Sequence, residues 1–224
     1  MRHPEEAAEF GQRAQRFLPP TLADLLPALL VSQGKASGTL RIIPVHRLDK
    51  ETSGLVVFAR TPAAASHLGE QFRQHTTERR YAALVRGQAR NGRIESLLVR
   101  DRGDGRRGSG TGKDGQRAVT HVRVVEQFRD FALVECRLET GRTHQVRIHL
   151  GEAQTPLCGE RLYDRPPHGA PLPDGSKAKR PLLHAAFLGL QHPATSKRLT
   201  WESPLPADMR DLLQRLRKAE RGEA

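Results

Sequence analysis

The sequence is poor in cysteine, and the cysteines it has are widely separated. Cys136 and Cys158 are the only two in 224 residues, and neither belongs to a CxxC pair. A disulfide framework or a Cys-based zinc site is therefore not expected, and the pattern is typical of a reducing compartment. We accordingly expect a cytoplasmic protein.

Long apolar runs are also lacking. The longest apolar tract lies around residues 22–31, and Asp24 and Pro27 interrupt it. A membrane-spanning helix needs about 20 mostly apolar residues, so we expect no membrane segment. The N-terminus also lacks the apolar core of a secretory signal peptide. Apolar residues make up 37% of the chain and aromatic residues 4%, which at this length suffices for the core of one large domain or two small ones.

Lysine is scarce, yet the chain is strongly basic. It contains 37 Lys and Arg residues against 25 Asp and Glu, a net charge of +12, and only 7 of the 37 are lysine. Arginine offers a planar fork of donors that binds phosphate and stacks on bases. The composition therefore indicates a polyanionic partner, most simply RNA or DNA. A coding bias toward arginine on an ordinary surface is the alternative, and composition alone leaves both open.

Periodicity and turn residues predict more strands than helices in the middle of the chain. A helix begins at Thr21, unless Pro27 divides it into two short turns. The other predicted elements are a buried strand over 55–59, a helix after Thr61-Pro62, a strand over 79–87, a hairpin of 118–128 with 131–139, and a terminal amphipathic helix within 204–221. Helices do not follow every strand. This favours an α+β fold with a mixed, largely antiparallel sheet over a doubly wound one.

Three segments are less regular. The stretch "TGRTHQVRIHL" fits either a strand or a short helix, and we favour a helix capped by Thr143. Residues 101–116 and 165–180 are rich in turn residues and predict loops. Each loop is either a solvated surface loop or an RNA contact.

Several familiar chemistries are excluded. The histidine pairs His144/His149 and His184/His192 are not spaced for one helical face, so no metal site is expected. In "GRRGSGTGK" the lysine is followed by Asp114, which does not match a phosphate-binding loop. No GxSxG motif is present, so a serine hydrolase is not indicated.

The stretch "HRLDKETSGLVVF" leaves Asp49 as the candidate for chemistry. Arg47 and Lys50 flank it, and an apolar run follows. A carboxylate among basic groups stays ionised, and such a group can act as a nucleophile or base. An aspartate in a turn is also often only a turn residue, so spacing alone does not decide.

Four segments in order resemble the RluA-like pseudouridine synthases. "HRLDKETSGLVVFAR" is similar to their His-Arg-Leu-Asp-x-x-Thr-Ser-Gly signature, and Tyr81 in "ERRYAALVRG" follows Asp49 by 32 residues, as the family tyrosine does. "LETGRTHQVRIHL" and "LLHAAFLGLQHP" resemble the two later motifs. The likeness covers about residues 21–206.

The resemblance implies an enzyme that isomerises specific uridines in structured RNA, ribosomal or transfer, to pseudouridine. No metal or cofactor is implied, and the fold would be the α+β pseudouridine synthase domain with its site in a basic cleft. The N1–C1′ bond breaks, the uracil turns, and C5 rejoins C1′. We expect the chain to act as a monomer.

The resemblance also implies roles for individual residues. Asp49 would be the essential carboxylate, attacking C1′ or removing the 2′ proton, and Arg147 would pair with it. Tyr81 would stack on the flipped uracil and assist at C5. Arg47 would fill the space that the base vacates. Arg142 and His144 would support the site or contact phosphate, whereas His149, His184 and His192 are expected to be structural.

Residues 1–20 depart from the family pattern. Relatives usually begin with a strand pair ending in Lys-Pro-x-Gly, and nothing similar precedes "TLADLL". We therefore divide the chain into an N-terminal segment, 1–20, that is truncated or replaced, and one catalytic domain, 21–224. The alternative function is an RNA-binding protein of the same fold that has lost activity with this segment.

Overall fold

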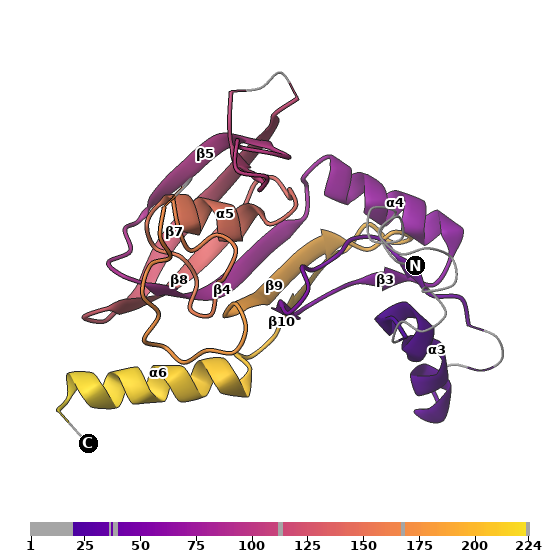
Figure 1. The fold of residues 1–224 in the computed structure, drawn as a ribbon. Helices are drawn as coiled ribbons and strands as arrows, with labels where there is room; N and C mark the ends of the chain where they lie inside the picture. The colour runs from indigo at the N-terminus through magenta and orange to yellow at the C-terminus, as the bar shows by residue number, and fades with distance from the viewer. Residues whose placement is uncertain (1–19, 36, 38–39, 112–113, 167–168, 223–224) are drawn as a thin grey trace.

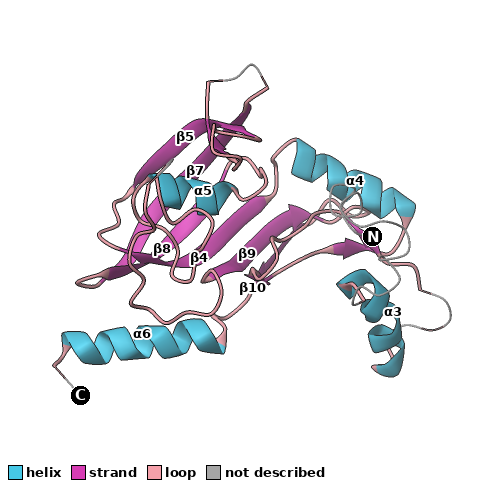
Figure 2. Cartoon of the chain, viewed as in Figure 1, coloured by secondary structure: helices cyan, strands magenta, loops and turns pink. Residues whose placement is uncertain are grey.

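The fold is built on one large sheet with helices around it (Figures 1 and 2). The computed structural model describes residues 20–35, 37, 40–111, 114–166 and 169–222. The strands are β1 (Ile43–Pro44), β2 (Ser53–Gly54), β3 (Phe58–Ala59), β4 (Glu78–Arg86), β5 (Gly92–Val99), β6 (Gly108–Ser109), β7 (Gln116–Gln127), β8 (Phe131–Leu138), β9 (Leu183–Gln191) and β10 (Arg198–Glu202). The helices are α3 (Leu22–Ser32), α4 (Pro62–Arg73), α5 (Gln145–Glu152) and α6 (Ala207–Glu220).

The eight-stranded sheet is mixed and mainly antiparallel. Its order is β10-β9-β4-β8-β7-β5-β6, and β2 joins it by pairing with β9 in parallel. A separate two-stranded sheet pairs β1 with β3. The expected α+β fold with a largely antiparallel sheet is confirmed. β4 lies in the middle between β8 and β9, so a side chain on it has a rigid backbone on both sides.

Helices α5 and α6 pack on opposite faces of the sheet. Successive strand residues point to opposite faces, and Val85 belongs to the apolar cluster that includes Val146 and Leu150 of α5. Its neighbour Leu84 belongs to the cluster that includes Leu212 of α6. Each fully buried side chain of this size contributes roughly 1.5–3 kcal/mol. The two layers therefore hold the central strands from both sides.

The predicted strand over 55–59 is wrong as a single element. Instead the chain pairs at Ser53–Gly54 with β9, then leaves that sheet and pairs at Phe58–Ala59 with β1. Gly54 makes the first contact possible, because its φ is +109° and an added Cβ would lie 2.3 Å from the Ala185 carbonyl oxygen. Close backbone approach at a positive φ is a role that glycine fills.

The other predicted elements are mostly confirmed. The first helix is continuous through Pro27, not two turns, and Asp24 accepts hydrogen bonds from the N–H and hydroxyl of Thr21. Thr61 caps α4 by accepting from the Ala64 N–H at 3.2 Å. The hairpin of β7 and β8 and the terminal helix are present. "THQVRIHL" is helical, but the helix begins at Gln145 after a left-handed His144, so Thr143 is not its cap.

Parts of the loop and terminal predictions are outside the described residues. Within 101–116 the short strand β6 pairs with β5, while 112–113 lie outside the described ranges. The expectation for residues 1–20 likewise falls almost wholly outside them, with only Pro20 described. Of the helices in the described ranges, none is long and apolar enough to cross a bilayer.

Candidate active site

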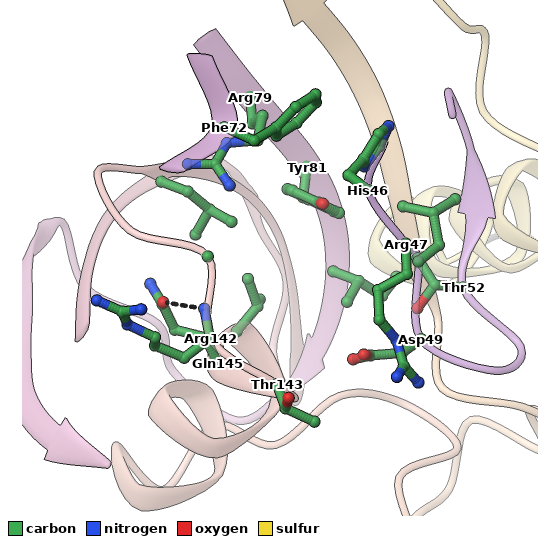
Figure 3. A pocket seen from close by; sticks show the side chains of 15 residues that line it. His46, Arg47, Asp49, Thr52, Phe72, Arg79, Tyr81, Arg142, Thr143 and Gln145 are labelled. Atoms are coloured by element: carbon green, nitrogen blue, oxygen red, sulfur yellow. Dashed lines mark hydrogen bonds between the residues drawn. The ribbon is translucent and has the colours of Figure 1, made fainter. Parts of the chain in front are cut away.

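A cavity of about 240 Å³ opens beside the middle of β4. Its walls come from the segment before β2, the end of α4, β4, and the turn that leads into α5. The lining residues are His46, Arg47, Leu48, Asp49, Thr52, Phe72, Arg79, Tyr81, Leu138, Gly141, Arg142, Thr143, Gln145, Val146 and Leu183. Figure 3 shows Phe72 and Arg79 at one end, Asp49 and Thr52 at the other, and Tyr81 between them.

Asp49 sits on a short turn that several contacts hold in place. The Thr52 N–H donates to the Asp49 carbonyl at 3.0 Å, and Glu51 adopts a left-handed φ of 74°. Arg180 donates to the Glu51 carbonyl at 2.8 Å. Immediately after the turn, β2 is hydrogen-bonded to β9. The carboxylate is therefore presented from a fixed backbone, half-buried in the cavity wall.

A second set of contacts fixes the end of this turn. The Ser53 hydroxyl is 2.9 Å from Nδ1 of His184, and Nε2 of His184 is 3.2 Å from the Ser203 carbonyl oxygen. Burial is the main cause that lowers the pKa of His184. His184 thus has the structural role expected of it, and it fastens the Asp49 turn to β9.

Tyr81 reaches the cavity from β4. Its backbone pairs with Cys136 of β8 and Ala185 of β9, and the register with β9 shifts between Arg80 and Tyr81. Burial raises the pKa of Tyr81 to about 12, and the charge of Asp49 adds to the effect, while Arg79 opposes it. The phenol is therefore neutral at physiological pH.

Arg147 was expected to pair with Asp49, but in the structure it pairs with Glu160 instead. Its Nε and Nη2 donate to the Glu160 carboxylate at 2.8 and 2.7 Å, and the Glu160 side chain is fully buried. Burial opposes the charge, but the Glu160 hydrogen bond and the charges of Glu160 and Asp49 together raise the pKa of Arg147. Arg147 therefore lies behind the cavity wall, where Glu160 binds it directly and the charge of Asp49 acts on it without direct contact.

His144 also lies behind the wall. Its Nδ1 is 2.7 Å from the Tyr163 hydroxyl, and Tyr163 packs against the Arg147 guanidinium, 5.3 Å from Cζ to the ring centroid. Burial lowers the pKa of His144, which Asp49 opposes and Arg147 reinforces. The left-handed backbone at His144 turns the chain into α5, so this residue shapes the entry of the helix.

Arg142 and Arg47 both line the cavity. The Nε of Arg142 donates to the Arg117 carbonyl at 3.1 Å. Gln145 orders the same turn, because its Oε1 accepts from the Arg142 N–H at 3.0 Å and from the Thr140 hydroxyl at 2.7 Å. Arg47 is exposed at the mouth.

His46, Phe72 and Arg79 are among the lining residues that were not predicted as site residues. The rings of His46 and Phe72 stack with centroids 4.3 Å apart, and His46 Nε2 accepts from the Val57 N–H at 3.0 Å. Burial, with Arg79 second, lowers the pKa of His46 to about 4. Arg79 could have been found from the sequence, since it precedes Tyr81 by two residues on one strand and so shares its face.

Among the described residues no group of three or more His, Cys, Asp or Glu side chains is arranged to hold a metal ion. What the cavity brings together is a carboxylate, a neutral phenol, three guanidinium groups and a stacked aromatic pair. These features define a basic α+β domain whose polar cavity has one aspartate facing a tyrosine.

Comparison with known proteins specifies the family. The family model described as RNA pseudouridylate synthase matches residues 20–152, and the chain belongs to this family. It is 40% identical over 207 residues to an uncharacterised RNA pseudouridine synthase of Bacillus subtilis, covering 92% of this chain and 66% of the relative. It is 41% identical over 199 residues to ribosomal large subunit pseudouridine synthase D of Nitrosomonas europaea, covering 86% and 56%.

The solved structures agree on the fold. Human RNA pseudouridylate synthase domain containing 4 superposes with a TM-score of 0.74 at 27% identity, covering 88% of this chain and 84% of that one. Human RNA pseudouridylate synthase domain containing 1 is 23% identical to this chain and supports the fold alone. The chain spans about two thirds of the Bacillus relative and just over half of the Nitrosomonas one.

Proposed function

We propose that this chain isomerises uridine to pseudouridine in structured RNA, with Asp49 as the essential carboxylate. The observation that carries the proposal is that a rigidly held Asp49 and a neutral Tyr81 face one cavity. The reaction breaks N1–C1′ and forms C5–C1′, moving the C5 proton to solvent while N1 gains one. Asp49 starts it either by attack on C1′ or by removing the 2′ proton.

Tyr81 is proposed to stack on the uracil and then to assist proton transfer at C5. With a pKa of about 12, roughly one phenol in 10⁵ is ionised at pH 7. Stacking therefore needs no change in protonation, whereas acting as a base requires the phenol to lose its proton in the complex. The flat ring of Tyr81 on β4 offers a stacking surface for a base that has left the RNA stack.

Arg147 is proposed to act through Glu160. The pair keeps one guanidinium charge fixed close enough to Asp49 for each to affect the other electrostatically. Because the Glu160 contact is bidentate and buried, Arg147 cannot swing to follow the substrate. It positions the start of α5 and keeps a fixed positive charge behind the cavity wall.

The RNA path is proposed to pass over the Arg142 turn. A second cavity of about 760 Å³ shares Arg142 and Thr143 with the first and is also lined by Arg100, Arg107, Asp101 and Asp114. Phosphates would lie along these arginines, as in RNA recognition by backbone contacts and shape. Arg47 would enter the vacated stack, and His144 would support the turn.

The relatives' names indicate which RNA to test first. One relative is named for the ribosomal large subunit, so large-subunit ribosomal RNA is the first substrate to test and transfer RNA the second. Working on such RNA, the protein would act in the cytoplasm, and we propose that it does so as a monomer without metal or cofactor. The domain is proposed to run over residues 21–224.

The test is to map pseudouridines in ribosomal and transfer RNA from cells lacking the protein, after incubation with it and a chelator. We expect at least one new site with the parent chain and a rate at least 10³-fold lower with Asp49→Asn, because no other carboxylate of the described residues lines the cavity. Asp211→Asn, an exposed aspartate on α6, is the matched control. An Asp49→Asn variant as active as the parent would refute the assignment, and RNA binding without any new site would favour the binding-only alternative.

A further inference from the structure

Arg79 is buried, and none of the described residues pairs with its charge. The residue is only 8% exposed, and its Nε and Nη2 atoms are covered by protein and make no hydrogen bond. Among the described residues its guanidinium has one aromatic contact, with the Phe72 ring, 5.8 Å from Cζ to the centroid. Burying an unpaired charge and unmet donors costs stability, so such a group usually awaits a ligand.

The surroundings of Arg79 add positive charge. Burial lowers the pKa of Arg79, Tyr81 opposes this effect, and the nearby charge of Arg142 lowers the pKa further. Burial lowers the pKa of His75, and the charges of Arg79 and Arg142 lower it further. Its Nδ1 is another buried atom that makes no hydrogen bond among the described residues. No carboxylate contributes to either shift, so the cluster of Arg79, Arg142 and His75 attracts an anion.

Gly141 leaves room for this arrangement. A Cβ at position 141 would lie 2.3 Å from Nη1 of Arg79. The guanidinium therefore sits directly against the loop that carries Arg142. Nε and Nη2 are the covered nitrogens, and Nη1, which lies next to the Gly141 loop, is not among them.

The donor pattern selects the ligand. A guanidinium presents N–H donors only, whereas the edge of uracil alternates acceptor, donor and acceptor. A phosphate offers acceptors alone and pairs with two such donors at once. The position fits as well, because Arg79 lies at the far end of the cavity from Asp49, with Tyr81 between (Figure 3).

We propose that Arg79, together with Arg142 on the Gly141 loop, forms a phosphate-binding site that holds a backbone phosphate next to the flipped uridine. The inference rests on the proposed function, because it places the uracil at Tyr81. It makes Arg79 a residue that binds substrate, at the expense of stability in the free protein.

The test compares Arg79→Met and Arg79→Lys with the parent chain and with Arg123→Met. Arg123 is an exposed arginine paired with Glu135 on the sheet and serves as the matched control. The probe is a fluorescein-labelled pentauridylate, and its dissociation constant is measured by anisotropy between 50 and 200 mM KCl. Thermal melting of each protein is measured alongside.

We expect Arg79→Met to weaken binding at least tenfold at 50 mM salt and to lower the slope of log K against log salt by about 0.7, the value for one phosphate contact on a single strand. Its melting temperature should equal or exceed that of the parent. Arg79→Lys should keep the slope with weaker binding, and Arg123→Met should change neither. Parent-like affinity and slope in Arg79→Met, or a melting temperature lowered by several degrees in both Arg79 variants, would overturn the inference.

Failure of the proposed function gives a different result. Suppose that the parent forms no pseudouridine in any RNA, while Arg79→Met still lowers the slope of log K against log salt. The phosphate site is then supported and the proposed activity is refuted. If the parent modifies RNA and Arg79→Met binds as the parent does, only the phosphate site is refuted.

Discussion

At the scale of single residues, the site depends on which side chains keep or lose their charge on burial. Tyr81 and His46 are both neutral because burial disfavours their ionised forms. Arg147 keeps its charge because Glu160 meets it with two hydrogen bonds. Arg79 keeps its charge with no such partner. The cavity therefore combines apolar stacking surfaces with cations at defined points.

Replacement of Tyr81 separates stacking from proton transfer. Tyr81→Phe keeps the ring, so RNA affinity should stay within threefold of the parent, while the single-turnover rate should fall by about 10²–10⁴ if the hydroxyl transfers a proton. Tyr81→Leu should also weaken binding, by about 5- to 100-fold, because base–aromatic stacking is worth roughly 1–3 kcal/mol. Anisotropy and single-turnover assays measure the two effects. Equal binding by the Phe and Leu variants would contradict stacking.

At the scale of elements, the Asp49 turn is held by segments distant in sequence. Arg180 donates to the Glu51 carbonyl and to the Ser53 hydroxyl, at 2.8 and 3.3 Å. The same guanidinium is bound by Asp208 at the start of α6, at 2.7 and 3.0 Å. The C-terminal helix is therefore connected through one arginine to the turn that presents the carboxylate.

Arg180 is accordingly expected to be a positioning residue. Arg180→Gln should lower kcat by about 10- to 100-fold with little change in KM, because the turn loses its clamp and small misplacements of a reacting group are costly. Asp208→Asn should give a smaller effect of the same kind, since Arg180 keeps its contacts to the turn. Steady-state kinetics on the RNA that carries the target uridine separates kcat from KM. A change in KM alone would show that Arg180 binds RNA instead.

At the scale of the whole molecule, the sheet positions the site and buried histidines set its tolerance of acid. His46 packs between Phe72 and the Val57 backbone, while His149 lies under β5 and β7, bound to Ser96 at 3.1 Å and Thr120 at 2.9 Å. Burial lowers the pKa of each to about 4. Both are neutral in the folded protein at pH values where the unfolded chain would protonate them.

The sign of the pH effect follows. A depressed histidine pKa means that the unfolded state binds more protons between about pH 6.5 and 4, so stability is full above that range and falls as the pH drops through it. Each histidine accounts for up to roughly 3 kcal/mol. Urea denaturation at several pH values should show this loss, and His149→Gln should reduce the slope by about one proton. His67→Gln, on an exposed face of α4, is the control. An unchanged slope in His149→Gln would contradict the assignment.

The sequence by itself determined the class of fold and much of the site. Alternation and turn residues sufficed for β4, the β7–β8 hairpin, α4 and α6, because these elements have strong local signals. The short strands β2 and β3 were misjudged, since they exist only through pairing with distant segments and through the close approach that Gly54 allows. Asp49, Tyr81 and Arg142 were identified from their motifs, and the cavity brings them together.

Only the tertiary structure decided which partners these residues have. Arg147 was expected to bind Asp49, but the fold places Glu160 against it, thirteen residues further along the chain. Arg180 and His184 reach the Asp49 turn from more than a hundred residues away. Arg79 shows its unmet charge only when burial is known. Ion pairing and desolvation depend on distances between segments, and local sequence patterns carry no information about those distances.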